Sequence, residues 1–169
     1  MIGQILEFSR LDADPQEERS PIDLDELLRA IVEDVKFEYG GTGVRIGFEA
    51  LSSGDTNGYP NALRSGVENV LRNAVQHNRD GGEIQVQFDR QGTQAVITIT
   101  DQGGGVAEGE LDRIFEPFYR STRGPNGSQP GSGLGLAIAS RAIALNQGSL
   151  TASNTEGGLC IQIRLPLSK

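Results

Sequence analysis

The chain has 169 residues, 23 of them glycine, with no tryptophan and a formal net charge of −8. This length suits a single globular domain, and an acidic chain without runs of lysine or arginine argues against nucleic acid as a partner. Because the one cysteine, Cys160, has no internal disulfide partner, and no segment resembles a membrane span or a signal peptide, we expect a reducing, aqueous compartment.

The first part of the chain has the pattern of a helix end followed by a linker. Residues 1–12 place isoleucine and leucine at helical spacing, whereas residues 13–21 are acidic and contain proline. A longer amphipathic helix follows, with Asp23 as its cap, Glu26 as the capping-box partner and Gly40 as its stop.

The main domain is expected at residues 22–169, where helices and strands do not alternate regularly. The expected strands are residues 44–51, 83–90, 94–101, 149–154 and 158–167, and the further expected helices are residues 61–77, a short one around 108–116 and one ending near Asn146. Because helices and antiparallel strands are grouped, the pattern favours an α+β two-layer sandwich. A doubly wound parallel sheet is the alternative.

One face of the helix expected at residues 61–77 is polar. Asn69, Asn73, Gln76 and His77 lie at i, i+4, i+7 and i+8, while the opposite face is apolar. Asparagine is a mediocre helix former, so two of them one turn apart suggest a role for their side chains. Amide oxygens are ligands that Mg²⁺ accepts alongside phosphate oxygens and water. The alternative is an ordinary solvated face.

A strand rich in β-branched residues ends at Asp101, and three glycines follow at positions 103–105. The carboxylate can accept a hydrogen bond from an amine, while the glycines let the backbone pass close to a planar or charged ligand. An ordinary turn that closes a strand is the alternative. Cys160 lies beside polar residues in the last expected strand and is expected to be a plain strand residue rather than a nucleophile.

The glycines of "GSGLGLAI", residues 131–138, stand at the start of an apolar helix. Free N–H groups and the positive end of the helix dipole favour an anion there, most naturally a phosphate. The pattern is not a P-loop, since no Lys-Ser/Thr follows the glycines, nor a dinucleotide fingerprint. The polar segment before it, residues 121–132, has the composition of a lid or a disordered loop.

Four motifs in order resemble those of one family. The strings "ENVLRNAVQHN", "DQGGGV", "FEPFYR" and "GSGLGLAI" are similar to the asparagine, first glycine, phenylalanine and second glycine boxes of the ATP-binding domain of sensor histidine kinases. That domain belongs to a superfamily shared with gyrase, chaperone and mismatch-repair ATPases, and the pattern is similar to envelope-stress kinases of the Cpx type.

The resemblance covers about residues 20–169, and "EFSRLD" resembles the end of the second helix of the kinase's dimerisation and histidine-phosphotransfer domain. It implies a Bergerat-type fold, in which a mixed, mostly antiparallel sheet is covered by helices on one face. On this basis residues 1–12 are the end of the dimerisation helix, residues 13–21 a linker and residues 22–169 the ATP-binding catalytic domain.

The resemblance also implies roles for individual residues, with ATP and Mg²⁺ as the cofactors. Asp101 would receive the adenine amino group, Asn73 would ligate Mg²⁺, and Asn69 would assist near the phosphates. The other implied ATP contacts are His77, Gly103, Gly105, Val106, Ser132, Gly133, Leu134, Gly135 and Leu136.

A lid over about residues 120–132 is implied as well. Phe115, Phe118 and Tyr119 would anchor it, with Phe118 and Tyr119 close enough to count among the ATP contacts. Arg120, at its start, would approach the γ-phosphate and take part in catalysis with Asn69 and Asn73.

The chain departs from the family's pattern at two positions. Kinases of this family usually carry Lys or Arg three residues after the magnesium asparagine, where this chain has Gln76, and then an aromatic residue, where it has His77. A neutral side chain cannot supply the lost charge, so weaker nucleotide affinity or phosphotransfer is implied. His77 is the one histidine of the chain and lacks the surroundings of a phosphoacceptor.

The phosphorylated histidine is therefore expected on a dimerisation domain outside this chain. A response-regulator partner, a homodimeric full-length protein and a cytoplasmic position in an inner-membrane sensor are implied too. Two alternatives stay open. An ATPase of the superfamily needs a general-base glutamate where this chain has Asn69, with Glu68 rotated by about 100° on the helix. A non-catalytic nucleotide-binding or docking module is favoured by Gln76.

Overall fold

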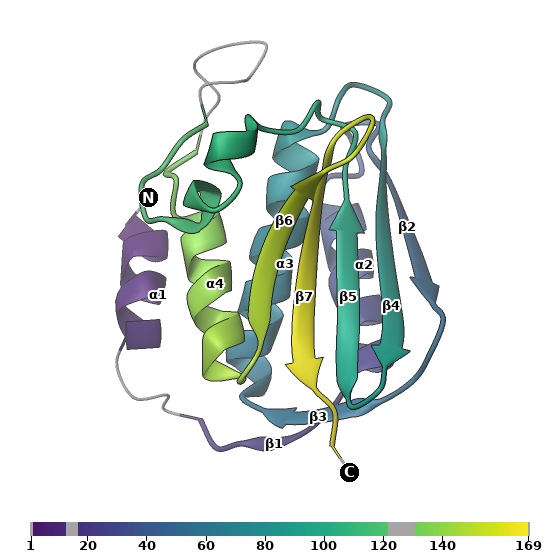
Figure 1. The fold of residues 1–169 in the computed structure, drawn as a ribbon, viewed down its shortest axis with the longest axis vertical. Helices are drawn as coiled ribbons and strands as arrows, with labels where there is room; N and C mark the ends of the chain where they lie inside the picture. Colours follow the sequence, from purple (N-terminus) through teal and green to yellow (C-terminus); the bar gives the residue numbers. More distant parts are fainter. Residues whose placement is uncertain (1, 13–16, 122–130, 169) are drawn as a thin grey trace.

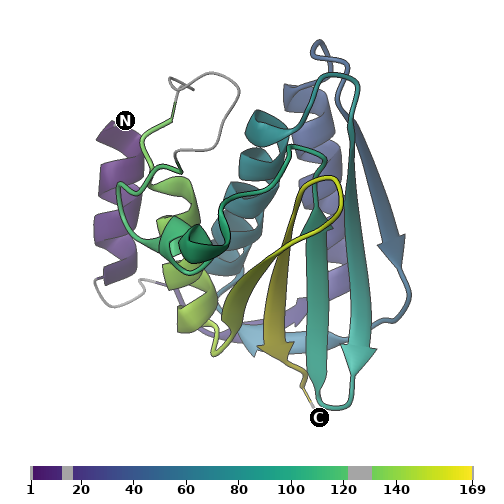
Figure 2. The same cartoon turned by 45° about the horizontal axis from the view of Figure 1, so that its top comes forward.

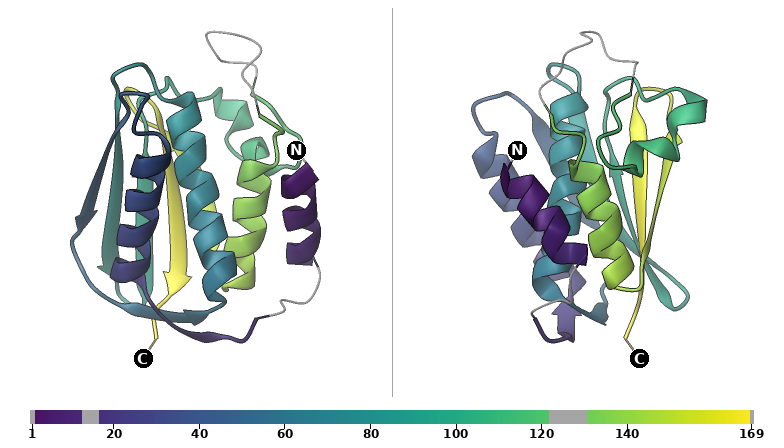
Figure 3. Two further views of the ribbon diagram at one scale, coloured as in Figure 1. Left: turned by 180° about the vertical axis from the view of Figure 1, so that it is seen from behind. Right: turned by 90° about the vertical axis from the view of Figure 1, so that its left-hand side faces the viewer.

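The computed structural model describes residues 2–12, 17–121 and 131–168. Its centre is a sheet of five strands in the order β2-β4-β5-β7-β6, with the helices on one face (Figures 1 and 3). The helical elements are α1 (Ile2–Asp12), α2 (Leu24–Glu38), α3 (Pro60–His77), α4 (Gly135–Leu145) and the 3-10 turns η1 (Glu108–Glu110) and η2 (Arg113–Phe115). The strands are β1 (Ser20–Asp23), β2 (Arg45–Ala50), β3 (Asp55–Gly58), β4 (Glu83–Gln91), β5 (Gln94–Thr100), β6 (Ser149–Asn154) and β7 (Leu159–Pro166).

The sheet is mixed and mostly antiparallel. β2 runs parallel to β4, whereas the pairs β4–β5, β5–β7 and β6–β7 are antiparallel. The predicted α+β two-layer sandwich is therefore confirmed, and the alternative of a doubly wound parallel sheet is wrong. In the described ranges, no helix has the length and apolar character that crossing a membrane requires.

Alternation along the central strands directs one set of side chains toward the helices. The buried strand residues on this face are Ile84, Val86, Phe88, Ala95, Ile97, Ile99, Leu159, Ile161, Ile163 and Leu165. Removing this apolar surface from water is the main favourable term in forming the two layers. Cys160 occupies the opposite face of β7, where it is half-buried and paired with Thr100 of β5 and Ser153 of β6, in accord with a plain strand position.

Helix α2 begins as predicted, because Asp23 Oδ1 accepts a hydrogen bond from the N–H of Glu26 (3.0 Å). The short helix predicted around residues 108–116 is instead the two 3-10 turns η1 and η2. Pro117 holds Glu116 extended (φ −70°, ψ 139°), so the second turn cannot continue as a helix.

A small second sheet of β1 and β3 has no counterpart in the sequence prediction. Residues Ser20–Asp23 pair with Asp55–Gly58 in antiparallel register. Four residues with a proline or a glycine among them are too short to show alternation, so neither strand has a recognisable pattern. Thr56, fully buried in β3, donates to the carbonyl of Pro166 (2.7 Å) and joins this small sheet to the end of β7.

The predicted linker, residues 13–21, contacts the domain where the structure describes it. The carboxylate of Glu17 accepts hydrogen bonds from the N–H groups of Asn61 (3.1 Å) and Ala62 (3.0 Å). These donors belong to the first turn of α3, whose own cap residue, Tyr59, makes no side-chain capping bond. Glu17 therefore caps α3 from another part of the chain.

Helices α3 and α4 lie side by side in opposite directions (Figure 3). Gly66 lets them approach closely, since a Cβ at this position would lie 3.1 Å from the Cβ of Ala142. At the end of α4, buried Asn146 donates to the carbonyl of Ala142 (2.8 Å) and accepts from the N–H of Tyr59 (2.8 Å). One side chain thus ties the last turn of α4 to the start of α3.

Candidate functional site

The predicted site residues gather at one end of the sheet. There β5 ends, β6 turns into β7, α3 reaches its last turns and α4 begins (Figure 2). The glycine loop after β5 crosses this end between the helices and the sheet. Motifs that lie far apart in the sequence therefore surround one region of the molecule.

Asp101 is a buried acceptor with one oxygen left over. It is 4% exposed, and its Oδ1 accepts hydrogen bonds from the N–H groups of Gly103 (2.8 Å) and Leu159 (3.2 Å). Burial raises the pKa of this carboxyl group, while the two N–H donors and the nearby His77 oppose the rise. Because both internal bonds end on Oδ1, Oδ2 can accept a donor from a ligand.

The glycine loop packs tightly against its neighbours. A Cβ at Gly103 would lie 1.9 Å from the carbonyl oxygen of His77, so only glycine fits between the loop and the end of α3. Gly105 has φ +72°, and a Cβ there would lie 2.4 Å from Oδ1 of Asn154. Both positions therefore need glycine for reasons of space, and Gly105 needs it for its backbone conformation as well.

Asn154, which the sequence analysis did not identify, holds the loop in place. Its Oδ1 accepts from the N–H of Val106 (3.0 Å), and its Nδ2 donates to the carbonyl of Val106 (2.8 Å) and to Oε1 of Glu108 (2.9 Å). The backbone of Val106 is thereby fixed from both sides. An asparagine at a strand end before a glycine pair is the one signal in the sequence, and it is a weak one.

Gly158 is a second residue that the sequence analysis did not identify. A Cβ there would lie 1.9 Å from the carbonyl oxygen of Asp101 and 2.7 Å from its Oδ1. The turn between β6 and β7 therefore packs directly against Asp101 and holds it in place. Neighbouring Gly157 has no atom within 4 Å of its Cβ position, so the two glycines differ sharply in their surroundings.

The polar face of α3 meets the start of α4 at Asn69. Its Nδ2 donates to the carbonyl of Ser65 (2.9 Å), while its Oδ1 lies 3.4 Å from the position of a Cβ on Gly135. An amide oxygen from one helix therefore faces the first residue of another. Asn73 follows one turn later and is half-buried, and Gln76 is exposed.

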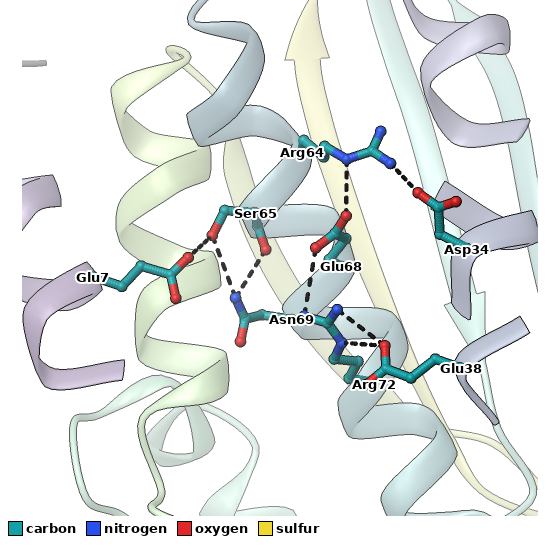
Figure 4. Close-up of polar contacts among 8 residues, drawn as sticks. All are labelled: Glu7, Asp34, Glu38, Arg64, Ser65, Glu68, Asn69 and Arg72. Carbon is teal, nitrogen blue, oxygen red and sulfur yellow. Dashed lines mark hydrogen bonds and ion pairs between the residues drawn. The ribbon is translucent and has the colours of Figure 1, made fainter. Parts of the chain in front are cut away.

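Glu68 points away from this meeting point (Figure 4). It forms ion pairs with Arg64 (2.9 Å) and Arg72 (3.4 Å), which in turn pair with Asp34 and Glu38 of α2. Glu68 thus belongs to a charge ladder between α2 and α3. It does not occupy the position that a general base next to the first turn of α4 would require.

His77, in the last turn of α3, lies in the electrostatic field of two other predicted site residues. Desolvation lowers the pKa of His77, the Asp101 carboxylate opposes this shift, and the Arg120 guanidinium adds to it. The influence of both charges on one imidazole indicates that Arg120 and Asp101 border the same region.

Tyr119 is anchored by a buried acid that the sequence analysis did not identify. Glu110, 9% exposed, accepts from the hydroxyls of Tyr119 (2.8 Å) and Ser121 (2.6 Å) and from the N–H of Ala107 (3.2 Å). The guanidinium of Arg113 lies over the Tyr119 ring at 4.5 Å. This cluster fixes the chain just before residue 122.

The residues that flank the predicted lid, Phe118 and Gly133, are joined to each other. Phe118 N–H donates to the carbonyl of Gly133 (2.9 Å), and a Cβ on Gly133 would lie 2.9 Å from Cα of Phe118. Phe118 has φ +62° and a side chain that is 67% exposed, whereas Phe115 packs against the core. The central part of the lid, residues 122–130, lies outside the described residues.

The start of α4 has the features of an anion site. No side chain caps it among the described residues, and no acidic residue stands in its first turn. Leu134 and Leu136 are buried, which fixes this turn against the core. The N–H of Leu134 donates to Oγ of Ser132 (3.2 Å), so a phosphate would share or replace that hydrogen bond. The N–H groups that follow belong to the first turn of α4, which no side chain caps among the described residues.

Comparison with protein families matches residues 58–169 to the histidine kinase-, DNA gyrase B-, and HSP90-like ATPases. Among curated relatives, the sensor protein PfeS of Pseudomonas aeruginosa is 34% identical over 98% of this chain and 37% of its own length. The sensor histidine kinase CpxA of Escherichia coli K12 is 40% identical over 66% of this chain and 24% of its own length. The chain therefore spans well under half of the length of these relatives.

Solved structures agree. The mycobacterial sensor histidine kinase MprB has a TM-score of 0.77 and 29% identity, covering 88% of this chain and 97% of the MprB chain. Full-length ShkA in complex with AMPPNP has a TM-score of 0.84 and 26% identity, covering 99% of this chain and 35% of the ShkA chain. In this chain the asparagine and glycine motifs lie together at one end of the sheet. The chain belongs to the histidine kinase-, DNA gyrase B-, and HSP90-like ATPases, as an ATP-binding domain of the sensor histidine kinase type.

Proposed function

We propose that this domain binds Mg-ATP at the end of the sheet and delivers the γ-phosphate to a histidine on a dimerisation domain. The observation that carries this proposal is that Oδ1 of Asn69 faces the start of α4. It lies 3.4 Å from the position that a Cβ on Gly135 would occupy. An amide oxygen and unshielded peptide N–H groups suit a metal-bound triphosphate, the first facing the metal side and the second the phosphate oxygens.

Each residue has a definite task in this proposal. Asp101 Oδ2 accepts the adenine amino group, with Gly103 and Gly105 leaving room for the base and Val106 beside it. Asn73 and Asn69 present amide oxygens to Mg²⁺ and its water, and the metal neutralises charge on the phosphates. The donors at the start of α4 hold the phosphate chain, so catalysis is mostly positioning and charge stabilisation.

Residues around the lid complete the proposed site. Arg120 approaches the γ-phosphate, His77 lies at the rim between phosphate and base, and Tyr119 holds the lid base through Glu110. Phe118 and Gly133 join the chain on the two sides of the lid, and Ser132 lies beside the start of α4. Contacts with ATP by these residues and by Leu134, Gly135 and Leu136 are part of the same proposal.

The remaining partners follow from the relatives, which are sensor kinases. We propose that α1 is the end of a dimerisation helix, that residues 13–21 link it to the catalytic domain, and that the full-length protein is a homodimeric inner-membrane sensor. This domain would then lie in the cytoplasm and pass phosphate, through the histidine, to a response regulator.

A phosphotransfer assay tests the proposal. The chain is mixed with a purified dimerisation domain that carries its histidine, with labelled ATP and Mg²⁺. We expect label on the dimerisation domain that depends on Mg²⁺ and is lost with Asn73→Ala. Binding of ATP without phosphohistidine would instead favour a non-catalytic module, and rapid release of free phosphate would favour an ATPase. The ion pairs that hold Glu68 away from the site argue against the ATPase.

Gln76→Lys is expected to tighten ATP binding. The side chain is exposed three residues after Asn73, so a lysine there adds a positive charge near the proposed phosphates. In water, the attraction between such a charge and a nearby phosphate is worth about 1 kcal/mol, or about fivefold in affinity, and it weakens at high salt. Calorimetric titration with Mg-ATP at two salt concentrations measures this change.

The matched control for Gln76→Lys is Asn61→Lys, on the same helix. Asn61 is exposed at the other end of α3, about 22 Å from Gln76 by helix rise. This distance is more than twice the Debye length of about 8–10 Å at ordinary salt, so a charge there is screened from the proposed phosphates. We expect no effect on ATP affinity from the control. Equal tightening by both variants would mean that net charge, not the position of Gln76, sets the affinity.

A further inference from the structure

Two side chains of α1, about one turn apart, reach toward the proposed nucleotide site. The hydroxyl of Ser132 donates to Oε1 of Gln4. The hydroxyl of Ser65 donates to Oε1 of Glu7, a contact drawn in Figure 4. Each serine oxygen also accepts a hydrogen bond from the site, from the N–H of Leu134 (3.2 Å) and from Nδ2 of Asn69 (3.4 Å). Each side chain of α1 is therefore connected, through one serine hydroxyl, to a group that is proposed to bind the nucleotide or its metal.

The contact through Ser65 has a fixed direction. A serine hydroxyl has one proton, and an ionised carboxylate can only accept, so the proton of Ser65 goes to Glu7. The oxygen of Ser65 is then left to accept from Asn69, whose Nδ2 also donates to the Ser65 carbonyl (2.9 Å). This arrangement selects one of the two amide orientations of Asn69, with Oδ1 toward Gly135.

We propose that Glu7 is a positioning residue for the nucleotide site, acting through Ser65 to keep the amide oxygen of Asn69 toward the metal side. The inference rests on the proposed function, because it assigns Glu7 to the same Mg-ATP site. Glu7 lies on α1, outside residues 58–169 that match the ATPase family. The site is thereby completed by a helix that is not part of the matched ATPase region.

Removing the carboxylate frees the proton of Ser65. In Glu7→Ala the hydroxyl proton can point at the Asn69 amide, so Asn69 loses the hydrogen bond from Nδ2 to the Ser65 oxygen (3.4 Å) and keeps only the one to the Ser65 carbonyl (2.9 Å). Its Oδ1 is then held less firmly toward the metal side, and the loss of one such positioning bond lowers affinity by about fivefold. The loss should appear for Mg-ATP and be absent for ATP measured with a chelator, because an amide oxygen serves the metal and not the phosphates.

Three further variants separate the loss of the hydrogen bond to Ser65 from the loss of the negative charge. Glu7→Gln keeps an oxygen that accepts from Ser65, so it should bind Mg-ATP like the unchanged chain. Ser65→Ala breaks the same relay from its other side and should match Glu7→Ala. The double variant Glu7→Ala/Ser65→Ala should be no weaker than Ser65→Ala, because both changes remove one interaction. Ser9→Ala, exposed on the same helix, is the control.

The test is a calorimetric titration of each variant with Mg-ATP and with ATP plus chelator, beside a thermal unfolding curve. Loss of metal-dependent affinity in Glu7→Ala and Ser65→Ala, with rescue in Glu7→Gln, supports the proposal. Equal loss with and without metal, failure of Glu7→Gln to rescue, or an equal effect of Ser9→Ala overturns it. If the unchanged chain fails to bind Mg-ATP, the proposed function itself is wrong, which is a different result.

Discussion

Asp101→Asn is expected to lower ATP affinity by roughly tenfold to a hundredfold while the fold stays intact. The two internal hydrogen bonds of Asp101 both end on Oδ1, and an asparagine oxygen can accept them at 2.8 Å and 3.2 Å in the same way. The change replaces only Oδ2, the proposed acceptor for the adenine amino group, by an NH₂ donor. Calorimetric titration with Mg-ATP measures the loss.

The stability of the same variant separates binding from folding. Because burial raises the pKa of Asp101 above its ordinary value of 3.8, the folded chain binds this proton more tightly than the unfolded chain does. The group's contribution to the free energy of unfolding therefore falls as pH rises through the interval above 3.8. Asp101→Asn removes that fall, so at neutral pH the variant should be at least as stable as the unchanged chain.

Asp112→Asn makes the same chemical change at an exposed position and serves as the control. It should alter neither affinity nor stability measurably. A folded Asp101→Asn variant that binds ATP as tightly as the unchanged chain would exclude Asp101 as the adenine acceptor.

Gly158→Ala is expected to destabilise the domain by more than about 2 kcal/mol and to abolish ATP binding by what remains folded. Its new Cβ would lie 1.9 Å from the carbonyl oxygen of Asp101. The strands cannot separate to make room without losing the hydrogen bond from Asp101 N–H to the Leu159 carbonyl (3.0 Å). Urea unfolding gives the loss of stability, and ATP titration gives the loss of binding.

Gly157→Ala is a matched control one residue earlier. Its Cβ would have no atom within 4 Å, so we expect a change in stability within about 0.5 kcal/mol. If the two alanine variants unfold at the same urea concentration, the close packing of Gly158 against Asp101 does not support the site.

The larger elements of the fold were predictable because their signals are local. The stripe of buried residues in α2 and the alternation in β4 and β5 repeat every few residues, and the cap at Asp23 lies three residues from its partner. The small sheet of β1 and β3 was missed because it depends on pairing across more than 30 residues. Its four-residue strands carry too little pattern to predict.

The residues of the candidate site also fall into two groups, those in local motifs and those whose partners lie far away in the sequence. Asn69, Asp101 and the glycines stand in motifs that identify them, whereas Glu110, Asn154 and Gly158 act on residues brought near only by folding. Asn154, for example, binds Val106 across 48 positions. Glu17 was likewise missed, because it caps a helix that begins more than 40 residues later. Supporting residues of this kind have no motif, since their partners are set by the three-dimensional arrangement.

Asn146 holds helix α4 at the end remote from the proposed phosphates, because its side chain joins the last turn of α4 to Tyr59. A helix of 11 residues is about 16 Å long, and at its other end buried Leu134 and Leu136 hold the first turn against the core. The peptide N–H groups proposed for the phosphates therefore stand on a helix that is fixed at both ends before any nucleotide arrives, so binding does not have to order it.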